Sequence, residues 1–206
     1  MSEINHTPAA VIRYSEMGIY LTHLPSYSFL DPYLRQFLYR LYHCKLYFKR
    51  YKLNINDMLN FNEKCILCNL AIDTPVHLFK NCIIGEQLRH KRDMLLNVYN
   101  IRNVQFSEEK IVYSCIENKN RPNNIIQLII TTANYSIYRM KMKKYYDHEF
   151  IISQENPVYT FVNRMKMRIM CDHIRFSFME FKNIWDPNNT QALFSYNENK
   201  ILTWNF

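Results

Sequence analysis

The feature that most constrains this sequence is a group of three cysteines and one histidine between residues 65 and 82. Cys65 and Cys68 form a Cys-x2-Cys pair, His77 follows after eight intervening residues, and Cys82 follows after four more. A Cys-x2-Cys turn presents two thiolates to one ion, and zinc prefers a tetrahedral shell of sulfur and nitrogen ligands. We therefore expect these four residues to bind one zinc ion. The alternative is that they are buried small side chains, because free cysteine is among the most buried residue types.

The residues before His77 predict a helical turn that positions His77 and Cys82. Asp73-Thr74-Pro75 is typical of a helix start, since Asp or Thr can accept a hydrogen bond from a free backbone amide and Pro is tolerated at the first position. Five residues turn an ideal α-helix by about 500°. His77 and Cys82 can therefore share a face only if the helix ends or loosens near Asn81. We expect one short helical turn that ends at Cys82.

Basic residues alternate with aromatic residues on the amino-terminal side of this group. The chain has 26 Lys and Arg against 18 Asp and Glu, a formal net charge of +8, and the stretch 35–52 contains no acidic residue. Basic side chains neutralise phosphates and aromatic rings stack on unpaired bases, so the pattern predicts contact with RNA or DNA, single-stranded or structured. The alternative is an amphipathic helix whose charges are merely solvated. The predicted contacts, including a second basic cluster after Cys82, are Arg35, Arg40, Tyr42, Lys45, Tyr47, Lys49, Arg50, Arg89, Lys91 and Arg92.

Apolar residues recur at helical spacing along most of the chain, which predicts a mostly α fold built around a small Cys-Cys-His-Cys zinc knuckle. We expect a helix of about five turns from Pro32, a short helix over Lys52 to Asn62, and a helix after Cys82. Two longer helices are expected over 126–142 and from Pro157 to a stop at 186–189, followed by one or two short strands. The predicted domains are a lead-in (1–31), the basic helices with the knuckle (32–100), and a carboxyl-terminal helical region (101–206).

One long segment resembles a known family. The stretch FLYRLYHCKLYFKRYKLNINDMLNFNEKCILCNLAIDTPVHLFKNC is similar to the zinc-binding region that follows the polymerase core in non-LTR (LINE-like) retrotransposon reverse transcriptases, and NNIIQLIITTANYSIYRMKMKK is similar to the helix after it. The resemblance implies a nucleic-acid-binding domain of such an enzyme, or derived from one. It also implies a reverse transcriptase core as a partner in cis or in trans.

The sequence does not predict catalysis by this chain alone. It has no paired aspartates after an aromatic residue, as a polymerase needs for its metal ions, and no Pro-Asp to begin the carboxylate set of a restriction-like endonuclease. Three cysteines and one histidine form a closed zinc shell without an open position for water. The other interpretation is a domesticated zinc-stabilised helical module that binds a protein partner.

The remaining cysteines predict an intracellular protein of the nucleus or cytoplasm. Cys44, Cys115 and Cys171 are scattered, unlike the dense disulfide framework of small secreted domains, and we expect them to be reduced and not to be metal ligands. The first residues lack the pattern of a signal peptide, and no apolar run approaches the ~20 residues that span a bilayer. We therefore expect no association with a membrane.

Overall fold

The computed structural model describes residues 29–43, 45–48, 64–99, 111–112, 121–152, 155–191, 193–196 and 202–205, and these residues are mostly helical. The chain divides into two compact units, Met1–Leu46 and Tyr47–Phe206, which are described separately below. This boundary falls inside the segment 32–100, which the sequence assigns to one domain. The predicted helix over Lys52 to Asn62 lies outside the described residues, as does the lead-in before residue 29.

The first unit contains helix α2 (Pro32–Tyr42), which begins as the sequence predicts. Asp31 caps it, since its carboxylate accepts a hydrogen bond from the Leu34 amide at 2.9 Å, and Pro32 occupies the first turn. The helix has 11 residues, so the prediction of about five turns is wrong. Its buried stripe is Leu34, Phe37, Leu38, Leu41 and Tyr42. The helix ends at Tyr42 although apolar burial continues beyond it at Leu46.

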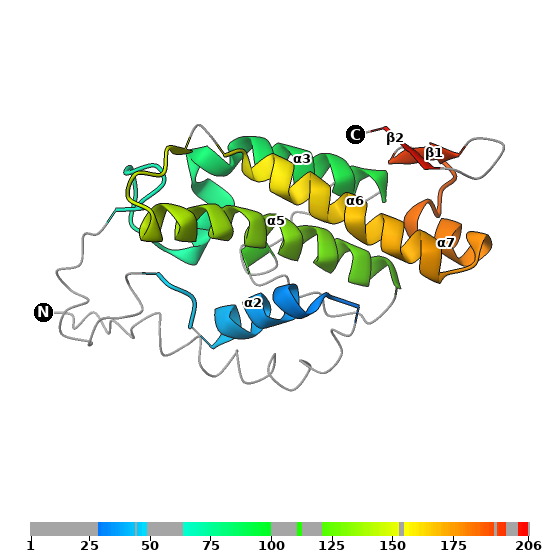
Figure 1. Ribbon diagram of the computed structural model, residues 1–206, viewed down its shortest axis with the longest axis horizontal. Helices are drawn as coiled ribbons and strands as arrows, with labels where there is room; N and C mark the ends of the chain where they lie inside the picture. Colours follow the sequence, from blue (N-terminus) through cyan, green and yellow to red (C-terminus); the bar gives the residue numbers. More distant parts are fainter. Residues whose placement is uncertain are drawn as a thin grey trace, which may run out of the picture. The chain divides into compact units, whose positions relative to one another are not determined.

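The second unit is centred on α5 (Arg121–Tyr146), which lies alongside α3 (Glu86–Val98) and α6 (Pro157–Arg175) (Figure 1). Every residue from 125 to 134 is buried, so this part of α5 is enclosed on all sides. The apolar positions that the sequence predicts for this helix are all buried: Ile126, Ile129, Ile130, Ala133, Ile137 and Met140. The prediction of this helix is confirmed.

Three of the buried polar side chains inside α5 find partners in the backbone, whereas Nε2 of Gln127 and Oγ1 of Thr131 are buried without a hydrogen bond to any described residue. The hydroxyl of Thr132 donates to the Leu128 carbonyl at 2.7 Å, and that of Ser136 donates to the Thr132 carbonyl at 2.8 Å. The amide of Asn134 donates to the Ile111 carbonyl at 2.7 Å. Such bonds keep these polar groups from being buried without a partner, which would cost free energy.

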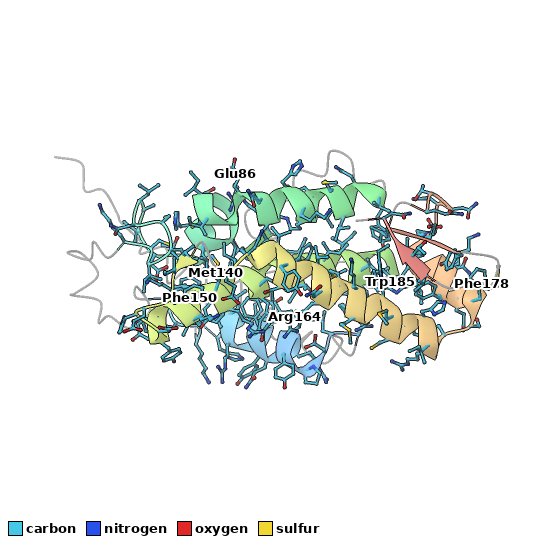
Figure 2. The ribbon with its side chains drawn as sticks, turned by 45° about the horizontal axis from the view of Figure 1, so that its top comes forward. Glu86, Met140, Phe150, Arg164, Phe178 and Trp185 are labelled. Carbon is cyan, nitrogen blue, oxygen red and sulfur yellow. The ribbon has the colours of Figure 1, made fainter. Side chains whose placement is uncertain are left out.

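The predicted helix from Pro157 to 186 is wrong in its length, because the structure divides it in two. Helix α6 ends at Arg175, and α7 (Phe178–Trp185) begins after a capping box in which Ser177 and Glu180 exchange hydrogen bonds. Trp185, at the end of α7 in Figure 2, donates its indole N–H to the Asp172 carboxylate of α6 at 3.1 Å. This bond ties the two helices together.

The strands expected near the carboxyl terminus are present. Strands β1 (Phe194–Tyr196) and β2 (Leu202–Trp204) pair antiparallel, with Phe194 opposite Trp204. Among the described residues, no helix is both long enough and apolar enough to cross a membrane.

Candidate metal centre

The structure brings the four predicted ligands together. The ligand atoms of Cys65, Cys68, His77 and Cys82 all lie within 4.8 Å of one another, and the Cys68 sulfur lies 3.2 Å from Nε2 of His77. In a tetrahedral site with bonds of about 2.0–2.3 Å, ligand atoms are about 3.3–3.8 Å apart, so small movements suffice to hold an ion. These four residues can therefore hold a metal ion. Within the described part of the chain no other such group is found.

The first two ligands are presented by a short loop closed by backbone hydrogen bonds. The Cys65 amide donates to the Ala71 carbonyl at 2.8 Å, and Lys64 pairs with Ile72 in an antiparallel bridge. Within the loop, the Asn69 amide donates to the Cys65 carbonyl at 2.8 Å, and Asn69 has a φ of 57°. Asn tolerates this left-handed conformation better than most residues, which allows the tight turn after Cys68.

The other two ligands flank a π-helical turn over His77–Asn81. The Thr74 hydroxyl caps its start by accepting a hydrogen bond from the His77 amide at 3.0 Å. At its end the Cys82 amide donates to the His77 carbonyl at 2.6 Å, a bond between residues five apart that defines a π-helix. The wider turn brings His77 and Cys82 toward one face, as an α-helix would not. The prediction of a helical turn that loosens and ends at Cys82 is confirmed.

Two of the sulfurs are enclosed, and each changes the pKa of the other. Cys65 and Cys82 are fully buried, whereas Cys68 is partly exposed. The hydrogen bond from Cys82 lowers the pKa of Cys65 to about 5, because it stabilises the thiolate. The same bond, together with burial, raises the pKa of Cys82. The contact thus favours one thiolate in the pair, and a metal ion that binds both sulfurs has to displace the remaining proton.

A buried ion pair that the sequence does not reveal anchors the loop between the two halves of the site. Lys141 of α5 donates to both carboxylate oxygens of Asp73, at 2.9 and 2.7 Å, and to the Tyr47 carbonyl at 2.9 Å. The side chains of Lys141 and Asp73 are 1% and 2% exposed. The Lys141 ammonium also lies 3.9 Å from the ring centroid of Phe48. The ion pair therefore fixes Asp73, which lies between Cys68 and Cys82 in the chain, to the central helix.

Close packing joins the end of the metal loop (residues 64–85) to helix α5. Leu78 and Phe79 of the π-turn are buried, and Phe79 meets the ring of Phe48 edge-on at 6.0 Å. At Gly85 a Cβ atom would lie 2.5 Å from Cδ1 of Ile137 in α5, so only glycine fits without displacement. Helix α3 follows directly at Glu86, which is labelled in Figure 2.

In the first unit, the predicted nucleic-acid contacts divide between exposed and buried positions. Arg35, Arg40 and Lys45 are exposed, whereas Tyr42 is only 1% exposed. The exposed tyrosines of α2 are instead Tyr33 and Tyr39, at 65% and 43%. They lie off the buried stripe of the helix, so helical periodicity could have identified them.

In the second unit, three of the four predicted contacts that the structure describes are engaged by other residues of the protein. The Tyr47 ring lies against that of Tyr145, with 4.1 Å between the ring centroids, and the Arg89 guanidinium donates to the Cys82 carbonyl at 2.8 Å. Burial, with the nearby Arg92 charge, lowers the pKa of Arg89. Arg92 itself is 5% exposed and pairs with Asp93 at 2.8 Å.

The remaining predicted contacts are Lys91, Lys49 and Arg50. Lys91 is half-buried, and Lys49 and Arg50 lie outside the described residues. Of the other cysteines, Cys171 is exposed and apart from the cluster, whereas Cys44 and Cys115 lie outside the described residues.

Comparisons of this chain with protein-family models, with curated proteins and with solved structures found no match. Functional inferences therefore rest on the residues of the chain itself.

Proposed function

We propose that this chain is a zinc-stabilised domain that binds RNA or DNA and performs no chemistry of its own. The observation that carries the proposal is the assembled group of Cys65, Cys68, His77 and Cys82. Three thiolates and one imidazole favour zinc over hard cations such as magnesium or calcium, which prefer oxygen ligands. Four protein ligands close the shell, which is the pattern of a structural rather than a catalytic zinc.

The exposed side of α2 supports the nucleic-acid part of the proposal. Tyr33, Arg35, Tyr39 and Arg40 are all exposed, and α2 contains no acidic residue. The Lys45 ammonium lies 5.6 Å from the ring centroid of Tyr39, which adds positive charge beside an exposed ring. Arginines that can neutralise phosphates next to rings that can stack on bases form the combination that single-stranded nucleic acid requires.

The resemblance to non-LTR retrotransposon reverse transcriptases extends this proposal to an origin and a partner. The first of the two similar segments runs without a break from Phe37 of α2 to Cys82. It therefore contains all four ligands and the basic residues that follow Phe37. On this basis we propose that the chain is a domain of such a reverse transcriptase, or a derivative of one, with a polymerase core as its partner in cis or in trans.

The test is the salt dependence of binding to a fluorescent single-stranded oligonucleotide. Removing one phosphate contact lowers the slope of log affinity against log salt by roughly 0.7 for single strands. Arg35→Ala with Arg40→Ala should therefore lower the slope by about 1.4, with the zinc content unchanged. The matched control is Arg139→Ala with Arg175→Ala, which removes two exposed arginines from α5 and α6 and should leave the slope as it is.

A second variant separates stacking from charge. Tyr39→Ala should weaken single-strand binding by ~1–3 kcal/mol, with little change in the salt slope, if its ring stacks on a base. A wild-type protein that binds no RNA or DNA at low ionic strength would contradict the proposed function.

One observation favours the alternative, a zinc-stabilised helical module that binds a protein partner. Helix α6 exposes Tyr159, Met167 and Ile174 by 70%, 59% and 83%. Several large exposed apolar residues along one helix are typical of protein–protein contacts. Partner binding that is insensitive to salt, without any binding of nucleic acid, would favour this alternative.

A further inference from the structure

An open hollow of about 600 Å³ lies directly beside the metal ligands. Cys68 and His77 contribute to its lining, together with Leu70, Ile72 and Ile83. These three apolar side chains are 71%, 43% and 57% exposed. A single exposed apolar residue is ordinary, but three around one hollow mark a binding surface.

The chemistry of the lining points to a flat, neutral ligand with a polar edge. Among the described residues, no Asp, Glu, Lys or Arg lines the hollow, so its walls suit an uncharged ring. Asn81 also lines it and is exposed, and its side-chain amide can both donate and accept hydrogen bonds. Aliphatic walls with one amide at the rim match the faces and the edge of a nucleobase.

A positive charge stands next to the hollow. Lys64 is directly opposite Ile72 in the antiparallel bridge, and Ile72 lines the hollow. Side chains of directly paired residues point to the same face of a ladder, with Cβ atoms about 4.5–5.5 Å apart. The exposed Lys64 side chain therefore rises from the same face as the hollow, where it can meet a phosphate.

We propose that this hollow receives one unpaired nucleobase of a single-stranded RNA or DNA. Leu70, Ile72 and Ile83 contact the faces of the ring, the Asn81 amide contacts its edge, and Lys64 contacts the adjoining phosphate. A paired base cannot enter, because its edge and faces are occupied within the duplex. The inference rests on the proposed function and deepens it. If the hollow binds an unpaired base, the metal loop distinguishes single strands from duplexes in addition to its structural role.

The first test follows the methyl groups of the hollow by NMR in the full-length, zinc-loaded protein. Three probes of equal length are added: a single strand, the same sugar-phosphate strand without bases, and a duplex. The methyl signals of Leu70, Ile72 and Ile83 should shift with the single strand alone. The strand without bases keeps the phosphates, so it isolates the contribution of the base.

The second test measures affinity with matched variants. Leu70→Ala with Ile83→Ala should lower the affinity for the single strand about tenfold, because a ring lying in this open hollow newly buries only about two methylene groups of the two side chains, at about 0.8 kcal/mol each. The salt slope and the zinc content should be unchanged, since no phosphate or metal contact is removed. The control is Met167→Ala with Ile174→Ala, which removes exposed apolar side chains outside the hollow and should leave affinity unchanged.

The outcomes separate this inference from the proposed function. Equal affinity for the strands with and without bases, with the methyl signals unmoved, overturns the inference but leaves phosphate binding intact. Absence of binding to all three probes overturns both. Methyl shifts produced only by an acidic amphipathic peptide would assign the hollow to a protein segment instead and overturn the inference. If the double variant loses zinc, Leu70→Ala alone replaces it, because this side chain is the most exposed of the three.

Discussion

The metal loop (residues 64–85) and the helical core around α5 are held together by different forces. In the core, every residue from 125 to 134 is buried, so packing on all sides, most of it apolar, stabilises the helix. The loop buries only Leu67, Leu78 and Phe79 as large apolar side chains, and otherwise depends on its four ligands and on the ion pair of Asp73. The core should therefore tolerate changes that disorder the loop, and three predictions test that difference.

Loss of the metal should have the largest effect, and it should be confined to the loop. Cys68→Ser removes one of four ligands, and structural zinc contributes apparent binding free energies on the order of 10 kcal/mol. We expect the zinc content to fall from about one ion per chain and hydrogen exchange to accelerate across 64–85, while the amides of α5 stay protected. Cys171→Ser, which changes an exposed cysteine outside the cluster, is the control and should retain zinc. Equal loss of protection in α5 would mean that the metal organises the core as well.

Breaking the buried ion pair should have the next largest effect. Lys141→Met leaves the Asp73 carboxylate buried without its cation, which costs about 3–5 kcal/mol of unfolding free energy. The matched control on the same helix is Lys143→Met. Its ammonium pairs with Glu155 at 3.0 Å but the side chain is 51% exposed, so the change should cost less than about 1 kcal/mol.

A double variant distinguishes a missing charge from impaired packing at this ion pair. Lys141→Met with Asp73→Leu removes both charges and should recover much of the stability that Lys141→Met alone removes. Denaturation in urea measures the free energy of unfolding of the unchanged protein, of Lys141→Met and of the double variant. No recovery in the double variant would show that the destabilisation comes from packing around Lys141.

The junction between loop and core should be the least sensitive of the three. Gly85→Ala places a Cβ atom 2.5 Å from Cδ1 of Ile137, and overpacking of this kind costs about 1–3 kcal/mol. Ile137→Val removes that methyl group, so it should recover part of the stability when combined with Gly85→Ala. Thermal unfolding of the single and double variants provides the measurement. Additive destabilisation would show that the two positions do not meet.

Local patterns predicted much of the fold and most of the metal site. The ligand set, the loosened turn before Cys82 and the buried positions of α5 each depend on residues close together in sequence. The ion pair of Asp73 and Lys141 joins residues that are 68 positions apart in the chain. No pattern in the sequence around either residue indicates that the two side chains pair. The division between α6 and α7 had a local signal in Ser177 and Glu180, but the apolar spacing continued past it and favoured one helix.

In the basic segment, the sequence did not show which side chains are buried and which are exposed. Composition predicted a basic and aromatic surface, but it did not distinguish the buried Tyr42 from the exposed Tyr39. That distinction depends on which face of α2 is covered, and the two positions are only three residues apart. Arg92 is a comparable case, because an arginine in a charged helix is ordinarily solvated and here it is 5% exposed.

The π-turn at His77–Asn81 also bears on how such a site can be recognised in other chains. A step of five residues along a π-turn and a step of four along an α-turn both bring the last two ligands to one face. Deletion of one residue between His77 and Cys82 would convert the first arrangement into the second with the same ligands. The spacings His-x4-Cys and His-x3-Cys can then present the same two ligands in the same metal site. An alignment gap at this point records the removal of a single backbone bulge rather than a different metal centre.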